Sequence, residues 1–399
     1  MTDIDFKKIL RHSPYYERLE PHSQTRNWMA WNGYKTPRVL DQLASEYFAI
    51  RSACSIMDLT PMEKYRITGP DAADYLNRLV TRDVSRLKPG RVTYVVWCND
   101  EGDVIDDGTI FHLSEGVYRL CAQHHQLDWL MLSAIGFDVS IEKEADDVAA
   151  LAVQGPTSFA VLSAAGVNSL DGLKPFGIQH TKCGGVDVTV SRTGFTGDLG
   201  YELWTAPENA HALWDAIFSV KERGLYDVKV IGLDALEMVR IEAGFLMPGW
   251  DFNTADTIVR AGRGRSPFEL GLEWIVDLKK PYFTGKKALT QEKARRPERR
   301  LLKLVIEGNK SPANSFLFDR KNGRNIGAVM STIWSPILKS NLAFADVRYK
   351  NGQPPAEIWA EIYYQKELQW NVSWARGRIE EKAFWSPERR TATPPAWTQ

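Results

Sequence analysis

The sequence has few cysteines and no excess charge of either sign. Its four cysteines lie far apart along 399 residues without a CxxC pair, so neither a disulfide framework nor a cysteine-based zinc site is expected. Fifty Lys and Arg residues balance fifty Asp and Glu residues, which leaves no basic surplus for nucleic acid or an anionic membrane. The first ten residues carry charge throughout and lack the apolar core of a signal peptide. We therefore expect a cytoplasmic protein with no nucleic-acid or membrane partner.

Motifs for nucleotides and metals are also missing. Gly262-Arg263-Gly264 is followed by no third glycine that would open a helix, so neither a Rossmann loop nor a Walker loop is present. His124 and His125 have no third ligand at metal spacing, and we predict no metal site. The composition is that of an ordinary globular protein, with 44% hydrophobic and 25% charged residues.

The order of strand-like and helix-like segments predicts an α+β fold. Val92–Trp97 and Val104–Leu113 predict a β-hairpin, and the apolar spacing of Val230–Ala243 predicts an amphipathic helix. The charged run Gln291–Arg300 predicts a linker between a region of residues 1–290, with two α+β subdomains, and a C-terminal domain of residues 300–390. Short strands in that second part predict a small β-barrel or sandwich.

Two carboxylates stand in unusual places. Asp106-Asp107 interrupts an apolar strand, so one of the two must face inward. Glu202 follows a glycine-rich stretch that lets the backbone approach a flat ligand, and its carboxylate could accept two parallel hydrogen bonds from an amidine-like edge. The rings of Phe195 or Tyr201 could stack on the same heterocycle. On local sequence alone, a paired buried Asp and a solvent-facing Glu are the commoner explanations, so spacing leaves both roles open.

Seven blocks of sequence follow the order of a known enzyme family. They are Leu79–Val84 with Leu87–Gly90, Asn99–Asp107, Leu151–Pro156, Arg192–Glu202, Gly232–Gly244, Ser266–Leu289 and Gly327–Val347. In this order they resemble the folate-dependent aminomethyltransferases of the glycine cleavage system (T-protein) and their tetrahydrofolate-dependent demethylase relatives. The resemblance covers nearly the whole chain.

The resemblance implies a multidomain cloverleaf with a C-terminal small β-barrel, in which tetrahydrofolate occupies a central channel. On the matching positions, Asp107 is the catalytic aspartate beside the folate N5, and Glu202 is the carboxylate that binds the pterin. The implied folate contacts also include Gln123, Phe195, Arg240 and Trp274, and Tyr201 is added to them as a possible stacking ring. For Arg240, Trp274 and the matching Asp251, a purely structural role is an equal alternative.

Departures from the family pattern shape the expected function. Gln123 replaces an asparagine that contacts the pterin, and Leu236 replaces an arginine expected on the folate or substrate side. The loss of that arginine speaks against a lipoyl carrier protein as partner. The leading hypothesis is therefore a methyltransferase or demethylase that moves a methyl group from a small methylated metabolite (a sulfonium, methylamine or aryl methyl ether) to N5 of tetrahydrofolate. The alternatives are a glycine-cleavage aminomethyltransferase that makes 5,10-methylenetetrahydrofolate, and a non-catalytic folate-binding protein.

Overall fold

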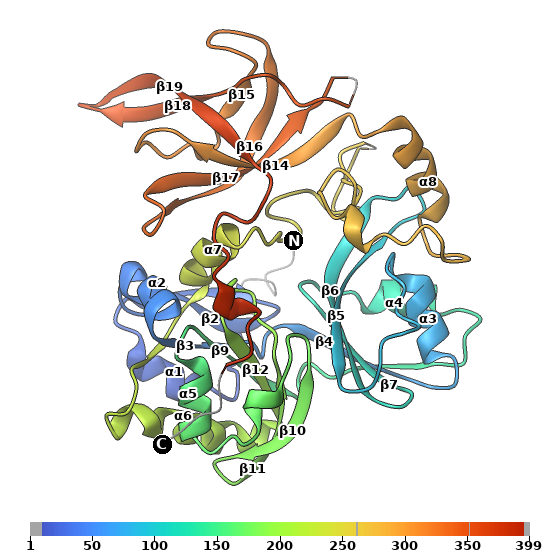
Figure 1. Ribbon diagram of the computed structural model, residues 1–399, viewed down its shortest axis with the longest axis vertical. Coiled ribbons are helices and arrows are strands. Elements are labelled where there is room, and N and C mark those ends of the chain that lie inside the picture. Colours follow the sequence, from blue (N-terminus) through green and yellow to red (C-terminus); the bar gives the residue numbers. More distant parts are fainter. Residues whose placement is uncertain (1–9, 261, 351, 395–399) are drawn as a thin grey trace, which may run out of the picture.

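The computed structural model describes residues 10–260, 262–350 and 352–394. The chain forms three lobes: a first lobe around a six-stranded sheet, a second around a five-stranded sheet, and a closed six-stranded barrel (Figure 1). This arrangement confirms the predicted α+β fold with a C-terminal barrel. In the described part of the chain, no helix combines the length and the apolar character needed to cross a membrane.

The first lobe holds the six-stranded sheet between helices on both faces. Its strands are β3 (Cys54–Asp58), β9 (Ala149–Gln154), β10 (Ile178–Cys183), β11 (Val186–Ser191), β12 (Gly200–Thr205) and β13 (Val228–Val230), and its helices are α1 (Tyr16–Leu19), α2 (Leu43–Ser52), α5 (Ser158–Ala164), α6 (Ala210–Glu222) and α7 (Leu233–Glu242). The strand order is β10-β11-β12-β9-β3-β13. A two-stranded sheet of β1 (Asn27–Trp31) and β2 (Tyr34–Val39) completes this lobe.

One face of this sheet packs on α5 and α6, the other on α2 and α7. Leu203 of β12 joins Leu162 and Ile217 in the core under α5 and α6. The next residue, Trp204, joins Val239 of α7 in a different cluster on the opposite face. Because side chains alternate along a strand, neighbouring residues of β12 serve two separate cores.

The second lobe carries helices on one face of its sheet only. Its elements are β4 (Glu63–Thr68), α3 (Ala72–Leu79), β5 (Arg91–Cys98), β6 (Val104–Ser114), β7 (Val117–Ala122), α4 (Leu127–Ser133) and β8 (Ser140–Lys143), with the sheet order β5-β6-β7-β4-β8. Strands β5 and β6 are the predicted hairpin and pair antiparallel. Leu76 of α3 and Leu130 of α4 pack against Ile110 of β6, which leaves the other face of the sheet free to meet the first lobe.

An apolar cluster joins the bare face of the second sheet to the first lobe. Phe111 of β6 and Trp204 of β12 meet edge to face, with ring centroids 5.1 Å apart. Val92 of β5 and Ala152 of β9 belong to the same cluster. Residues on the same sheet face as Phe111 in β6, or as Trp204 in β12, therefore point into the space between the lobes.

The barrel follows a short helix. Helix α8 (Lys286–Arg295) occupies part of the charged run that predicted a linker, and the barrel strands are β14 (Arg299–Ile306), β15 (Phe316–Phe318), β16 (Asn325–Ser335), β17 (Ser340–Arg348), β18 (Ile358–Lys366) and β19 (Gln369–Glu380). They close in the order β14-β17-β16-β15-β18-β19. The inward side chains, such as Leu304 and Ala343, form a core of their own.

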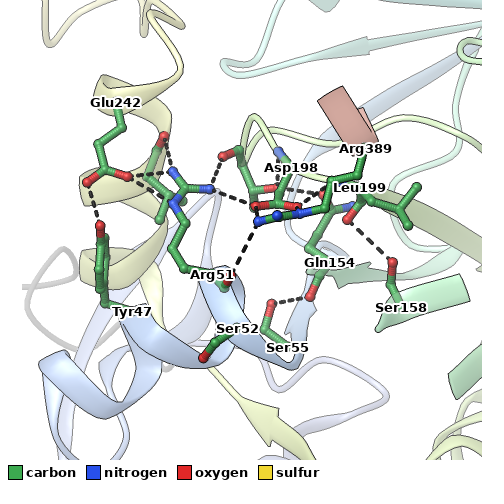
Figure 2. Close-up of polar contacts among 12 residues, drawn as sticks. Tyr47, Arg51, Ser52, Ser55, Gln154, Ser158, Asp198, Leu199, Glu242 and Arg389 are labelled. Atoms are coloured by element: carbon green, nitrogen blue, oxygen red, sulfur yellow. Dashed lines mark hydrogen bonds and ion pairs between the residues drawn. The ribbon is translucent and has the colours of Figure 1, made fainter. Parts of the chain in front are cut away.

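After β19 the chain returns to the first lobe, where side-chain ion pairs hold it in place. Figure 2 shows Arg389, in the short helical turn Glu388–Arg390, beside the buried Asp198. Its guanidinium donates to both carboxylate oxygens at 2.6 and 2.9 Å. Arg51 of α2 lies 3.5 Å from Asp198 and 2.6 Å from Glu242 of α7. Ser335 of the barrel also donates to Glu242, at 2.6 Å, so this network joins the tail, the barrel and two helices.

Candidate active site

The two adjacent aspartates of β6 point to opposite sides of the second sheet. Asp106 is fully buried on the helix side and accepts hydrogen bonds from the backbone N–H groups of Asp107, at 2.9 Å, and His124, at 3.1 Å. Asp107 shares the face of Phe111 and therefore looks into the space between the lobes. The sequence expectation that one of the pair faces inward is met by Asp106, and Asp107 is the one free for chemistry.

Asp107 holds its proton more tightly than an ordinary aspartate. Burial raises its pKa, and the nearby charge of Asp106 raises it further. The hydroxyl of Tyr94 donates to Oδ2 of Asp107 at 2.5 Å, which stabilises the charged form and opposes this rise. A carboxyl group with a raised pKa can both take up and release a proton near neutral pH.

Glu202 points into the same space from the first lobe. It lies two residues from Trp204 on β12 and so shares the face of that ring. Thr193 donates a 2.5 Å hydrogen bond to Oε2 of Glu202 and orients its carboxylate. Burial raises the pKa of Glu202 to about 7. The two carboxylates singled out in the sequence thus enter one inter-lobe space from opposite sheets.

Tyr201 does not share this face. It alternates with Glu202 along β12, is fully buried and belongs to the core under α5 and α6. The prediction that Tyr201 stacks on a ligand beside Glu202 is therefore wrong, because consecutive side chains of a strand point to opposite faces. Phe195 remains in a suitable position, because it packs against the inter-lobe cluster and stacks on Phe245 with centroids 5.4 Å apart.

A second aromatic pair flanks Asp107. The ring of Tyr94 stacks near Trp274, with centroids 6.1 Å apart. Trp274 is 62% exposed, so its face is open to a ligand. Sequence reasoning missed Tyr94. The pairing of Tyr94 with Thr109 places it on the Asp107 side of the hairpin, and only the strand register reveals this.

Arg240 forms ion pairs with two carboxylates of the same chain. Its guanidinium is fully buried and pairs with Asp251 and Glu237, each at 2.5 Å. The charge of Asp251 adds to the rise in the pKa of Asp107, so this ion cluster lies near the candidate catalytic group. Among the two alternatives for Arg240, the contacts favour the structural one. Gln123 follows β7 and is partly exposed, and its backbone carbonyl accepts a 3.1 Å hydrogen bond from Asn32.

Leu236 supplies an apolar group where the family pattern has a guanidinium. It lies on α7, is 9% exposed and packs in the inter-lobe cluster. Two cavities, of about 570 and 310 Å³, adjoin the lobes elsewhere, and neither is lined by Asp107 or Glu202. The candidate site is therefore defined by its facing carboxylates and aromatic pairs.

These residues fit a reduced pterin. A pterin presents N3–H and a 2-amino group side by side, which matches the two oxygens of one carboxylate, here Glu202. The stacked Phe195 and Phe245 offer an aromatic wall on the same side of the site. Asp107 enters from the opposite sheet, where it can stabilise positive charge on a reacting nitrogen. The site thus offers two facing carboxylates and an aromatic wall to a flat ligand with a polar edge.

Comparison with known proteins identifies the family. The family described as GCVT N-terminal domain matches residues 21–280. An aminomethyltransferase of Halothermothrix orenii is 31% identical over 333 residues, which cover 82% of this chain and 89% of the relative. A trimethylamine-oxide aldolase of Ruegeria pomeroyi is 33% identical over 378 residues, 90% of this chain but 46% of that longer protein. The chain belongs to the GCVT family of folate-dependent one-carbon transferases.

A solved structure shares the fold. The glycine cleavage system aminomethyltransferase T of Bartonella henselae superimposes with a TM-score of 0.78 at 24% identity, covering 94% of this chain and 98% of that one. This agreement extends over all three lobes and confirms the cloverleaf architecture.

Proposed function

We propose that the protein transfers a one-carbon unit from an aminomethyl donor to tetrahydrofolate, forming 5,10-methylenetetrahydrofolate and releasing the amine. The observation that carries this proposal is the pair of carboxylates, Asp107 and Glu202, that enter one space from facing sheets. Relatives named aminomethyltransferase, similar over most of both chains, support the same reaction class. For this reason we put aminomethyl transfer, the alternative left by the sequence, ahead of methyl transfer.

Glu202 would bind the pterin edge, and Asp107 would handle the proton. The donor carbon becomes bonded to N5 and N10 of tetrahydrofolate, and each of these nitrogens loses one proton. One proton is taken up by the released amine and the other by the group that had carried the aminomethyl unit. Asp107 is suited to hold one of those protons because burial raises its pKa. The two facing sheets hold the reactants in line. This arrangement increases the rate because less translational and rotational entropy has to be lost on reaching the transition state.

Methyl transfer is the second candidate. Its support is Leu236, which leaves an apolar surface where the family pattern has an arginine. The same feature favours a small donor over a lipoyl carrier protein. The similarity to a trimethylamine-oxide aldolase over 90% of this chain is also consistent with a small amine. In this case the methyl carbon bonds to N5, its bond to the donor heteroatom breaks, and the N5 proton passes to Asp107 or water.

Product analysis separates the two reactions. The protein is incubated with tetrahydrofolate and with aminomethyl-lipoyl carrier, sarcosine, dimethylglycine, a sulfonium and an aryl methyl ether in turn, and the folates are resolved by mass spectrometry. Formation of 5,10-methylenetetrahydrofolate supports the proposal, whereas 5-methyltetrahydrofolate selects the second candidate. Folate binding without either product points to a non-catalytic binding protein. Asp187→Asn, which changes an exposed aspartate of β11 that pairs with Lys182, is assayed as the control for Asp107→Asn.

A further inference from the structure

Arg82 occupies a fixed position at the edge of the second lobe. It follows the end of α3, and its backbone carbonyl accepts a 2.9 Å hydrogen bond from the ammonium group of Lys280. The same ammonium group donates to the carbonyl of Val80 at 2.6 Å. Since both carbonyls share one buried cation, the loop that carries Arg82 is held in place.

The side chain of Arg82 reaches the aromatic pair beside Asp107. Its guanidinium carbon lies 5.6 Å from the ring centroid of Trp274, and Nη1 donates to the carbonyl of Tyr94 at 3.3 Å. Tyr94 in turn donates from its hydroxyl to Asp107. Arg82 is thus connected to the candidate catalytic carboxylate through one tyrosine, and its guanidinium lies over the ring of Trp274.

No carboxylate pairs with Arg82 among the described residues, which sets it apart from Arg240, where two carboxylates do so. The adjacent Asp83 is engaged by the hydroxyl of Ser85 at 2.6 Å. Burial lowers the pKa of Arg82, and no acid offsets that effect. A half-buried guanidinium has five N–H donors in a planar fork, and a single bond to Tyr94 leaves most of the fork available.

We propose that Arg82 binds a carboxylate group of a ligand at the Asp107 end of the site. The carboxylate belongs either to the one-carbon donor or to the glutamyl part of the folate, and the inference rests on the proposed function. Asp106 and Asp107 form an acidic pair at this end of the site, so an anionic ligand needs a cation to offset the repulsion. The exposed ring of Trp274 supports the apolar stem of the ligand. Two N–H groups of Arg82 donate to its carboxylate in bidentate geometry.

The test compares carboxylate ligands with neutral analogues. Dissociation constants are measured for tetrahydrofolate against tetrahydropteroate, which lacks the glutamate, and for dimethylglycine and 4-methoxybenzoate against their amides. Each ligand is tested on the wild type, Arg82→Gln, Arg82→Lys and Arg78→Gln. Arg78 is the matched control: it is an exposed arginine of α3 whose guanidinium lies over Tyr282, away from Asp107.

The expected result is a loss of about 10- to 100-fold in affinity for one class of carboxylate in Arg82→Gln, with a smaller loss in Arg82→Lys. A loss confined to tetrahydrofolate assigns the glutamyl group, and a loss confined to the small acids assigns the donor. The neutral analogues and Arg78→Gln should stay within about twofold of the wild type. Equal binding of carboxylates and neutral analogues by the wild type, or equal loss of both in Arg82→Gln, overturns the proposal.

Failure of the proposed function is observed separately. A wild type that forms no one-carbon product contradicts the proposed reaction, while the binding comparison still decides the role of Arg82. Thermal unfolding of Arg82→Gln checks that the variant is folded. Arg82→Lys keeps the positive charge and provides a second folded comparison if the glutamine variant is unstable.

Discussion

The hydroxyl of Tyr94 donates a 2.5 Å hydrogen bond to Oδ2 of Asp107 across the β5–β6 hairpin. This bond stabilises the charged carboxylate, while burial and the charge of Asp106 favour the protonated one. The opposing effects set the pH range in which Asp107 can accept a proton. Tyr94 therefore lowers the pKa of Asp107, in addition to forming part of the aromatic pair with Trp274.

Removal of the Tyr94 hydroxyl should move the pH profile of the reaction. In Tyr94→Phe the charged form of Asp107 loses its hydrogen bond, so the pKa of Asp107 rises further. Because the reaction needs the ionised form as proton acceptor, the acidic limb of kcat/KM should shift to higher pH by about one unit. The measurement is kcat/KM from pH 5 to 9. Tyr363→Phe, which changes an exposed barrel tyrosine, should leave the profile in place, and an unshifted limb in Tyr94→Phe would disprove the coupling.

Folate binding should weaken as pH falls through neutrality. Burial raises the pKa of Glu202 to about 7, and only the ionised carboxylate accepts both donors of the pterin edge. The dissociation constant of tetrahydrofolate should therefore increase by about tenfold between pH 8 and pH 6. Glu202→Gln should bind weakly at both pH values and lose this dependence, whereas Glu208→Gln at an exposed position should behave as the wild type. A Glu202→Gln variant of normal affinity would exclude the pterin assignment.

Local pattern could single out the carboxylates of the site but not their roles. Strand alternation made Asp106 and Asp107 candidates, and the glycine-rich stretch did the same for Glu202. The roles of Asp107 and Glu202 were implied by the family resemblance alone. The same alternation, applied to β12, predicts that Tyr201 faces the core and Glu202 the opposite side, as the structure has them. Tyr94 required the register of β5 on β6, which the sequence does not state.

Long-range contacts explain what the sequence left unpredicted. Arg389 and Asp198 are separated by 191 residues and meet only because the tail returns from the barrel to the first lobe. No local pattern carries that information, since each residue alone resembles an ordinary surface charge. The barrel itself was predictable because short strands separated by turns recur after the charged run.

Loss of Arg389 should loosen the tail. Asp198 is fully buried at its side chain. Without Arg389 it keeps a 2.9 Å hydrogen bond from the backbone N–H of Leu199, and among the described residues its remaining cation is Arg51 at 3.5 Å. Arg389→Ala should therefore lower the free energy of unfolding by about 2 kcal/mol, as measured by urea unfolding. Arg376→Ala removes an exposed pair with Glu357 and should cost less than about 0.5 kcal/mol. Equal effects of the two variants would show that the buried network does not hold the tail.

Gly108 should tolerate no side chain. A Cβ at this position would lie 2.0 Å from the carbonyl oxygen of Cys121 on the paired strand β7, so the strands beside Asp107 would have to separate. Gly108→Ala should lower the free energy of unfolding by about 2 kcal/mol and reduce turnover. Gly172→Ala meets no atom within 4 Å and serves as the control. A stable and fully active Gly108→Ala would contradict the close approach of the two strands.

The central claim is that Glu202 binds the folate and Asp107 carries out the transfer. The most direct test is the rate of one-carbon transfer to tetrahydrofolate by Asp107→Asn at saturating folate, measured together with its folate affinity. We predict a rate at least about 100-fold below the wild type, with the dissociation constant of tetrahydrofolate changed by no more than about twofold. An Asp107→Asn enzyme that transfers the one-carbon unit at the wild-type rate would contradict the account.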